Sequence, residues 1–313
     1  GISTSYLSMI VSAANGVLLF LILNNLNSRK WINLSTSGIF TIVILFLFCT
    51  PHLWLGISGR GWYFSQVLTA FFLAFAIYAA LRSWSAWSVG ALIATAMTAR
   101  PTALMTWPFL LAITLQILKE NQEEVELKHV VQWSAKTVVP ISVAVIGLLT
   151  YNYLRFENFL DFGYVTVNAG PDIVRNVQQW GTFSPHFIPI NLSVMLFKLP
   201  FWNPGGRWFI LPSATGMSVF LTTPALIYLF RRYSKDWWVI GAWAAVFFSV
   251  ALLSLYHNTG AHQFGYRYIL DFLTPLIVLL AVGFKKKTPW HFQLLVVISI
   301  AINLYGTHWF MNG

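Results

Sequence analysis

Residues 260–271 bring ionisable side chains together between two long apolar runs of the sequence. Arg267 and Asp271 lie four residues apart, and His262 and Tyr266 stand close to them. A charged side chain in or near hydrocarbon is costly unless it is paired or hydrated, which makes it a candidate for a functional site. On a helix, residues four apart share one face. The spacing therefore predicts an Arg267–Asp271 pair, which either only neutralises itself or orients the guanidinium toward an anion.

Two more arginines have the chemistry of an anion site. Arg60 lies between two glycines in residues 51–63, which also contain His52, and Arg100 directly precedes Pro101. A guanidinium offers a planar fork of donors that matches phosphate. The alternative for both arginines is a structural role, in which a long side chain reaches from an apolar segment toward water. Arg60 and Arg100 are therefore candidate phosphate ligands beside Arg267.

Other common kinds of site lack support in the sequence. His257 and His262 are five residues apart, a spacing that is not typical of metal ligands, so a metal is unsupported without being excluded. The single cysteine, Cys49, rules out an internal disulfide and a cysteine-based metal site. Neither a phosphate-binding loop for ATP nor a nucleophile elbow occurs. We therefore expect no direct use of ATP.

The elements that position these residues are predicted to be transmembrane helices. The chain has 313 residues, of which 57% are hydrophobic and only 9% are charged, whereas soluble domains carry about 25% charge. The net charge of +10 does not indicate nucleic-acid binding, because the basic residues fall in short loops and form no separate stripe. Composition thus predicts an all-α, multi-pass integral membrane protein.

Ten apolar runs are long enough to be considered as spans, since a span needs about 20 residues. Two of them, 84–99 and 102–118, are short and form either two thin spans or one re-entrant hairpin. The ten runs are 5–24, 34–50, 64–81, 84–99, 102–118, 137–152, 207–230, 237–256, 268–284 and 290–309.

The distribution of basic residues predicts the orientation of the spans. With the N-terminus outside, the clusters Arg231-Arg232 and 285–287 fall on the inner side, as the positive-inside rule expects. Merging 84–118 into one span would place Arg29 and Lys30 outside, which favours two crossings. The candidate site residues then lie toward the outer face.

Two longer connections interrupt the single transmembrane domain of residues 1–313. The inner segment 119–136 is rich in Glu and is expected to be a short solvated or amphipathic helix. The outer segment 152–206 exceeds the usual length of a connection, so it is expected to be structured, as a lid embedded in the domain.

Three sequence stretches resemble one known group of membrane enzymes. Residues 98–102 (Thr-Ala-Arg-Pro-Thr), 151–159 and 264–272 occur in an order and spacing similar to those of bacterial multi-pass glycosyltransferases of the GT-C superfamily. The protein O-mannosyltransferase and lipid A aminoarabinose transferase types are the nearest in pattern. The resemblance covers almost the whole chain.

The resemblance implies transfer of a sugar from a polyprenyl-phosphate donor to a glycan, lipid or protein acceptor. The reaction would take place at the outer face of a cell membrane, the bacterial inner membrane. The lipid tail would lie between helices, and the donor phosphate would meet Arg267, with Arg60 and Arg100 as further candidates. The supporting residues would be Asp271, Tyr266, His262 and His52.

The resemblance also implies a catalytic base that this sequence does not supply in the expected place. Members use an Asp in the first outer loop, and some hold a divalent metal. The present chain starts at what resembles the second span, so the base is expected upstream of Gly1; either the chain is a truncated fragment that is inactive alone, or the base comes from elsewhere. Asp161 and Glu157 are the substitutes on the outer side.

Two functions of other classes remain open. One is a transporter or flippase for a lipid-linked or anionic solute, which should show repeated halves and broken helices. No internal repeat is found in the sequence. The other is a non-catalytic membrane protein.

Overall fold

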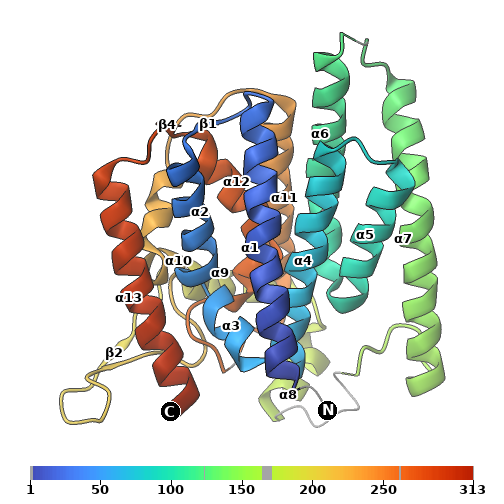
Figure 1. Ribbon diagram of the computed structural model, residues 1–313. Helices are drawn as coiled ribbons and strands as arrows, with labels where there is room; N and C mark the ends of the chain where they lie inside the picture. Colours follow the sequence, from blue (N-terminus) through green and yellow to red (C-terminus); the bar gives the residue numbers. More distant parts are fainter. Residues whose placement is uncertain (1–2, 123, 164–170, 261, 313) are drawn as a thin grey trace.

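The computed structural model describes residues 3–122, 124–163, 171–260 and 262–312, and most of these are helical. The only strands within these ranges are four two-residue elements in two pairs. The all-α expectation is confirmed. Figure 1 shows the long helices side by side, with both chain termini at one end of the bundle. We call this the terminal end, and the opposite end, where β1 and β4 lie, the basic end.

Among the described residues, six helical segments are long and apolar enough to cross a membrane. A seventh span exists if the bent pair α2 (Thr36–Phe48) and α3 (His52–Ser58), which meet at 55°, counts as one. Ten spans are therefore not confirmed. The six are α1 (Thr4–Ser28), α4 (Gly61–Leu81), Pro101–Glu120, which joins the 3₁₀ helix η1 (Pro101–Thr106) to α6 (Trp107–Glu120), α7 (Leu127–Phe156), α11 (Trp237–Leu255) and α13 (Trp290–Asn312).

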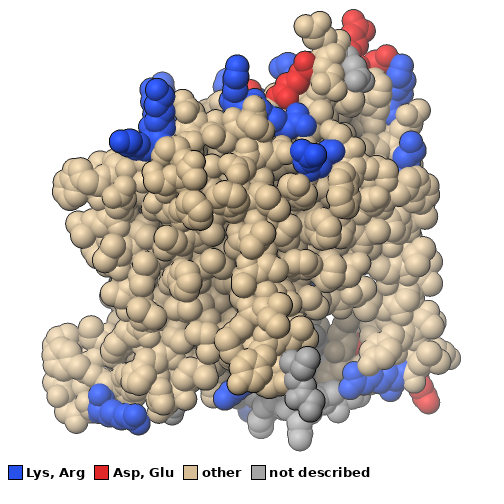
Figure 2. Space-filling view, viewed as in Figure 1, with Lys and Arg blue, Asp and Glu red and all other residues tan. Residues whose placement is uncertain are grey.

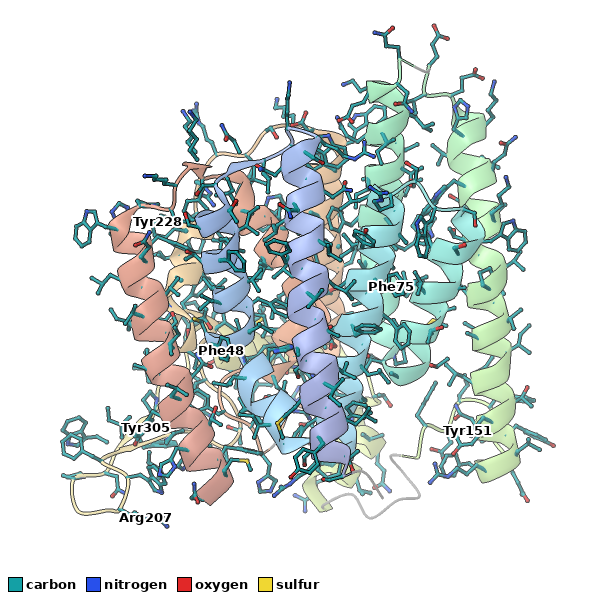
Figure 3. All side chains as sticks on the ribbon, viewed as in Figure 1. Phe48, Phe75, Tyr151, Arg207, Tyr228 and Tyr305 are labelled. Carbon is teal, nitrogen blue, oxygen red and sulfur yellow. The ribbon has the colours of Figure 1, made fainter. Side chains whose placement is uncertain are left out.

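On the face shown in Figure 2, charged side chains lie at the two ends of the bundle and leave an apolar belt between them. Figure 3 places Tyr228 near the basic end and Tyr151, Tyr305 and Arg207 near the terminal end. Tyrosines at both borders of an apolar belt are typical interfacial anchors. The distribution is that of a membrane protein.

The segment 84–118 forms a helix that enters the bundle and a second that returns. α5 (Ala86–Ala99) has 14 residues, about 21 Å at 1.5 Å per residue, which is too short for a hydrocarbon core of about 30 Å. It stops because Arg100 precedes a proline and takes an extended backbone, with φ −152° and ψ 114°. The chain then returns through η1 and α6 to the basic end (Figure 1).

The prediction of a span over 207–230 is wrong. This segment contains the strand β3 (Ile210–Leu211), the single turn α10 (Val219–Thr222) and the 3₁₀ helix η3 (Pro224–Leu229). Pro212 and Pro224 remove backbone donors that a helix needs, and Gly216 has a left-handed φ of +112°. The run is apolar, but its local chemistry breaks a helix.

The last predicted runs also differ from single long helices. The run 268–284 is divided between the 3₁₀ helix η4 (Arg267–Asp271) and α12 (Leu273–Val282). After α12, β4 (Lys285–Lys286) pairs in parallel with β1 (Asn33–Leu34). α12 therefore occupies only the part of the bundle toward the basic end (Figure 1).

The two connections have different outcomes. The prediction of a short helix over 119–136 is wrong. The long helix α6 extends to Glu120 and the long helix α7 begins at Leu127, so only a short connection lies between them. The described part of the outer segment is structured: it contains α8 (Pro171–Trp180), the 3₁₀ helix η2 (Pro185–Phe187), α9 (Ile188–Leu196) and β2 (Phe201–Trp202), which pairs with β3.

The outer segment is fastened to the end of α11. The amide of Asn191 donates to the carbonyls of Phe187, Ser254 and Tyr256, at 3.1, 3.0 and 2.8 Å. The backbone N–H of Ser184 donates to Leu255. These bonds place the segment against the terminal end of the bundle.

Candidate anion site between α4, α5 and η4

A buried ion pair joins two helix breaks that are distant in sequence. The Nε and Nη2 atoms of Arg100 donate to the two carboxylate oxygens of Asp271, each at 2.8 Å. The hydroxyl of Thr102 donates to the same carboxylate at 2.8 Å. The Asp271 side chain has no exposed surface, and 18% of the Arg100 side chain is exposed. Both carboxylate oxygens of Asp271 thus accept hydrogen bonds from residues at the break that follows α5.

The predicted pair between Arg267 and Asp271 is therefore wrong. These residues lie in η4, a 3₁₀ helix with about three residues per turn instead of 3.6. Four residues along such a helix turn the side chain by about 120° from the starting direction, whereas in an α-helix the offset is about 40°. Asp271 therefore faces Arg100, and Arg267 points elsewhere.

Arg267 is held by polar groups of α4 and by its own backbone. Its Nη1 donates to the Oε1 atom of Gln66 at 2.9 Å, and the amide of Gln66 returns a 3.2 Å bond to the Arg267 carbonyl. Nη2 donates to the hydroxyl of Tyr268 at 3.4 Å, and the backbone N–H donates to Gln263. The Nε atom is buried and has no hydrogen-bond partner among the residues that the structure describes.

Two aromatic rings cover the arginines. The guanidinium carbon of Arg267 lies 4.6 Å from the ring centre of Tyr268 and 5.5 Å from that of Tyr63. The guanidinium carbon of Arg100 lies 5.0 Å from the same Tyr268 ring. Cation–π contacts of this kind gain strength when the groups are desolvated. The Tyr268 ring therefore contacts both Arg100, whose charge is balanced by Asp271, and Arg267, whose charge is not balanced by a carboxylate of the described residues.

The difference between the two arginines defines the candidate site. Arg267 is only 7% exposed, yet no carboxylate pairs with it among the residues that the structure describes. Burial lowers the pKa of the His257 imidazole, which follows the end of α11. A buried guanidinium without a counter-ion, with one N–H unused, is arranged to receive an anion.

An apolar groove borders the same 3₁₀ helix. Ile269 of η4 and the following Phe272 line it on one side. The other sides come from the outer segment, α10, η3 and α11: Met195, Leu196, Val219, Phe220, Leu226, Leu229, Phe230, Trp243 and Val250, with Leu276 of α12. A hydrocarbon chain would match this lining.

The remaining candidates from the sequence lie around the site or away from it. Arg60 is exposed at the start of α4, with its guanidinium 5.9 Å from the Phe310 ring. His52 is buried in α3, where Nε2 meets the Asn15 amide at 3.1 Å. The structure gives neither residue a direct bond to Arg267. Arg100, Arg267 and Asp271 are brought together, whereas Arg60 and His52 are not.

The other supporting residues are neighbours in the chain with different environments. Tyr266 is buried, with its ring edge-on to Tyr268 at 5.8 Å. His262 is exposed at a left-handed φ of +51°, and its carbonyl accepts a bond of 2.5 Å from the Tyr63 hydroxyl.

Both substitute carboxylates are exposed or partly exposed beyond α7. Glu157 caps α7 in a left-handed conformation, and Asp161 accepts from the backbone of Gly163 at 2.7 Å. No bond joins either residue to Arg267 in the described ranges of the chain.

Sequence reasoning missed Gln66, Thr102 and the role of Tyr268. Gln66 had a usable signal, since it is a polar amide inside the apolar run 64–81. Thr102 and Tyr268 had none, because hydroxyl-bearing residues are frequent in this chain. Within the described residues no cluster of three or more His, Cys, Asp and Glu is placed to hold a metal ion.

Comparisons with family models, with curated proteins and with solved structures found no match.

Proposed function

We propose that this chain is a membrane glycosyltransferase, of the GT-C type that its sequence resembles, which takes a sugar from a polyprenyl-phosphate donor. The observation that carries the proposal is the buried Arg267, which has no carboxylate partner among the described residues and an unused Nε–H group. A lipid-linked phosphate is the anion that also suits the neighbouring apolar groove. Transfer itself, and the outer face as its location, rest on the sequence resemblance.

The proposed role of Arg267 is to stabilise the leaving phosphate. When the sugar leaves, negative charge develops on the phosphate oxygen, and a prearranged cation in a dry site stabilises that charge strongly. Gln66 and Tyr268 fix the guanidinium through hydrogen bonds, so little reorganisation is needed. The groove beside Ile269 and Phe272 would hold the first units of the lipid tail.

Asp271 has a positioning role in this proposal. Both its oxygens already accept bonds from Arg100 and Thr102, so the carboxylate is poorly placed to remove a proton from an acceptor. It instead joins η4 to the break after α5 and so determines where Arg267 sits. The base that activates the acceptor is expected outside this cluster.

The test compares Arg267→Ala and Arg267→Lys with Arg155→Ala, which removes an exposed arginine at the C-terminal end of α7. Removing one partner of a buried charge contact costs about 2 kcal/mol or more, which is about thirtyfold in affinity. We expect Arg267→Ala to bind a fluorescent polyprenyl phosphate at least about thirtyfold more weakly and to lose sugar transfer in membranes. Arg155→Ala should keep both, and equal binding by all variants would refute the phosphate role.

A transporter for a lipid-linked or anionic solute is the second candidate. Its supporting observation is the set of breaks in apolar helices, at the 55° bend between α2 and α3, after α5, and between η4 and α12. Discontinuous helices commonly line transport sites. Proteoliposomes loaded with a labelled polyprenyl-phosphate sugar distinguish the two: movement across the bilayer without transfer supports transport, and transfer without movement supports the enzyme.

A further inference from the structure

A second pocket lies at the basic end of the bundle, at the opposite end of α12 from the anion site. Its cationic wall consists of Lys30, Lys285 and Lys286. Apolar side chains and one amide make up the rest: Trp31, Ile32, Asn33, Val282 and Phe284. We call it the lysine pocket. It combines positive charge with an apolar lining in one cavity.

The backbone around the lysine pocket is held in a defined shape. The loop after α1 and the loop after α12 are joined by the parallel pairing of β1 and β4, with Asn33 opposite Lys285. The Ser35 N–H donates to the Lys286 carbonyl at 2.6 Å. Lys30 and Lys286 both adopt left-handed φ angles, +61° and +57°, which are uncommon for residues other than glycine. Such conformations persist where the surrounding structure imposes them.

The aromatic residues of the pocket are also fixed. Trp31 stacks on Trp238 of α11, with ring centres 5.2 Å apart and an angle of 20° between planes. The guanidinium carbon of Arg231 lies over the Phe284 ring, 4.8 Å from the ring centre. Arg231 therefore adds a fourth positive charge directly behind a pocket residue.

The three lysines have no acidic partner among the residues that the structure describes. Two ion pairs are found at the basic end, and they join Arg29 to Glu120 and Lys128 to Glu126. Neither involves a lysine of the pocket. Figure 2 shows basic side chains gathered at this end, directly above the apolar belt. The positive charge of the lysine pocket is thus uncompensated at the border of the membrane.

We infer that the lysine pocket binds the headgroup of an anionic phospholipid from the leaflet at the basic end. The pocket lies where α1 ends at Ser28 and α12 ends at Val282, and such apolar helix ends would meet lipid phosphates at the border of the hydrocarbon. The lysines would meet the phosphodiester, and Ile32, Val282 and Phe284 would contact the glycerol and the start of the acyl chains. Basic pockets between spanning helices are suited to such headgroups. This inference is independent of the proposed function.

The test uses two triple variants that remove the same charge from the same end. Lys30→Gln/Lys285→Gln/Lys286→Gln empties the pocket of cations, and Lys128→Gln/Lys136→Gln/Lys235→Gln leaves it intact. Each purified protein is titrated in detergent with phosphatidylglycerol and with phosphatidylcholine, and bound lipid is counted by native mass spectrometry. At roughly fivefold per lysine, the pocket variant should bind phosphatidylglycerol about a hundredfold more weakly.

The control variant should bind phosphatidylglycerol like the wild type, and phosphatidylcholine should bind weakly to all three proteins. Equal losses in both variants would mean a diffuse surface attraction and would overturn the site. Wild-type binding by the pocket variant would overturn it as well. Glycerol phosphate at millimolar concentration tests the source of the phosphate: if it displaces phosphatidylglycerol completely, the site recognises a soluble phosphate and the lipid assignment fails.

Discussion

Substitutions at Arg100 and Asp271 can test whether Asp271 pairs with Arg100, as the structure shows, or with Arg267, as the sequence spacing predicts. Arg100→Met leaves the Asp271 carboxylate, which has no exposed surface, without its counter-ion. Breaking a buried pair in this way costs about 3–5 kcal/mol. Asp271→Asn should cost less, about 1–3 kcal/mol, because the new amide oxygen still accepts from Thr102 and Arg100 is 18% exposed.

A double-mutant cycle measures the coupling directly. The double variant Arg100→Met/Asp271→Asn should be destabilised by about 2–3 kcal/mol less than the sum of the two single variants, since they share one interaction. The matched cycle of Arg267→Met with Asp271→Asn should give a coupling below about 1 kcal/mol. The assay is the free energy of unfolding in mixed micelles, followed by tryptophan fluorescence as SDS is added.

Two results would refute this reasoning. The first is a stronger coupling of Asp271 to Arg267 than to Arg100, which would restore the local pair and remove the free cation from the anion site. The second is an Arg100→Met variant less than about 1 kcal/mol below the wild type, which would mean that water reaches the carboxylate.

Three further predictions concern packing, the anion site and the outer segment. Gly241→Ala should lower the free energy of unfolding by about 1–3 kcal/mol, because the new Cβ would lie 2.3 Å from a side chain of α6 and 3.0 Å from its backbone. Gly147→Ala is the matched control: its Cβ would have no atom within 4 Å, so the variant should raise the free energy of unfolding by up to about 1 kcal/mol. Gln66→Glu places a carboxylate against Arg267 Nη1, now 2.9 Å from the amide oxygen, so it should weaken polyprenyl-phosphate binding at least about tenfold. It also removes the amide bond to the Arg267 carbonyl, which should cost about 1–3 kcal/mol of unfolding free energy. Asn191→Leu removes the two bonds from the outer segment to the carbonyls of Ser254 and Tyr256 at the end of α11, and it should increase cleavage of that segment by added protease severalfold.

Each of these has a contrary outcome. Equal stability of the two alanine variants would mean that α6 and α11 are not in close contact at Gly241. Unchanged phosphate binding by Gln66→Glu would show that Arg267 does not receive the ligand. Unchanged proteolysis of Asn191→Leu would show that the outer segment is held by other contacts.

The broken helices explain why the number of spans was overestimated. Hydropathy reports only that a run is apolar, and the runs 207–230 and 268–284 are apolar. Prolines such as Pro212 and Pro224 carried the signal of the breaks. A buried apolar segment need not be a helix if protein surrounds it and satisfies its backbone groups. Length and composition therefore predict membrane class better than they predict span count.

The sequence by itself determined that this protein is helical, apolar and basic at its loops, because these properties follow from composition and from the length of apolar runs. It also singled out Arg100, Arg267 and Asp271, since charge is rare in such a chain. Only the tertiary structure decided which of them pair: Asp271 meets Arg100 across 171 residues, and Arg267 meets Gln66 across 201. No local pattern encodes contacts at such separations, and the 3₁₀ geometry of η4 turned the two neighbouring charges apart.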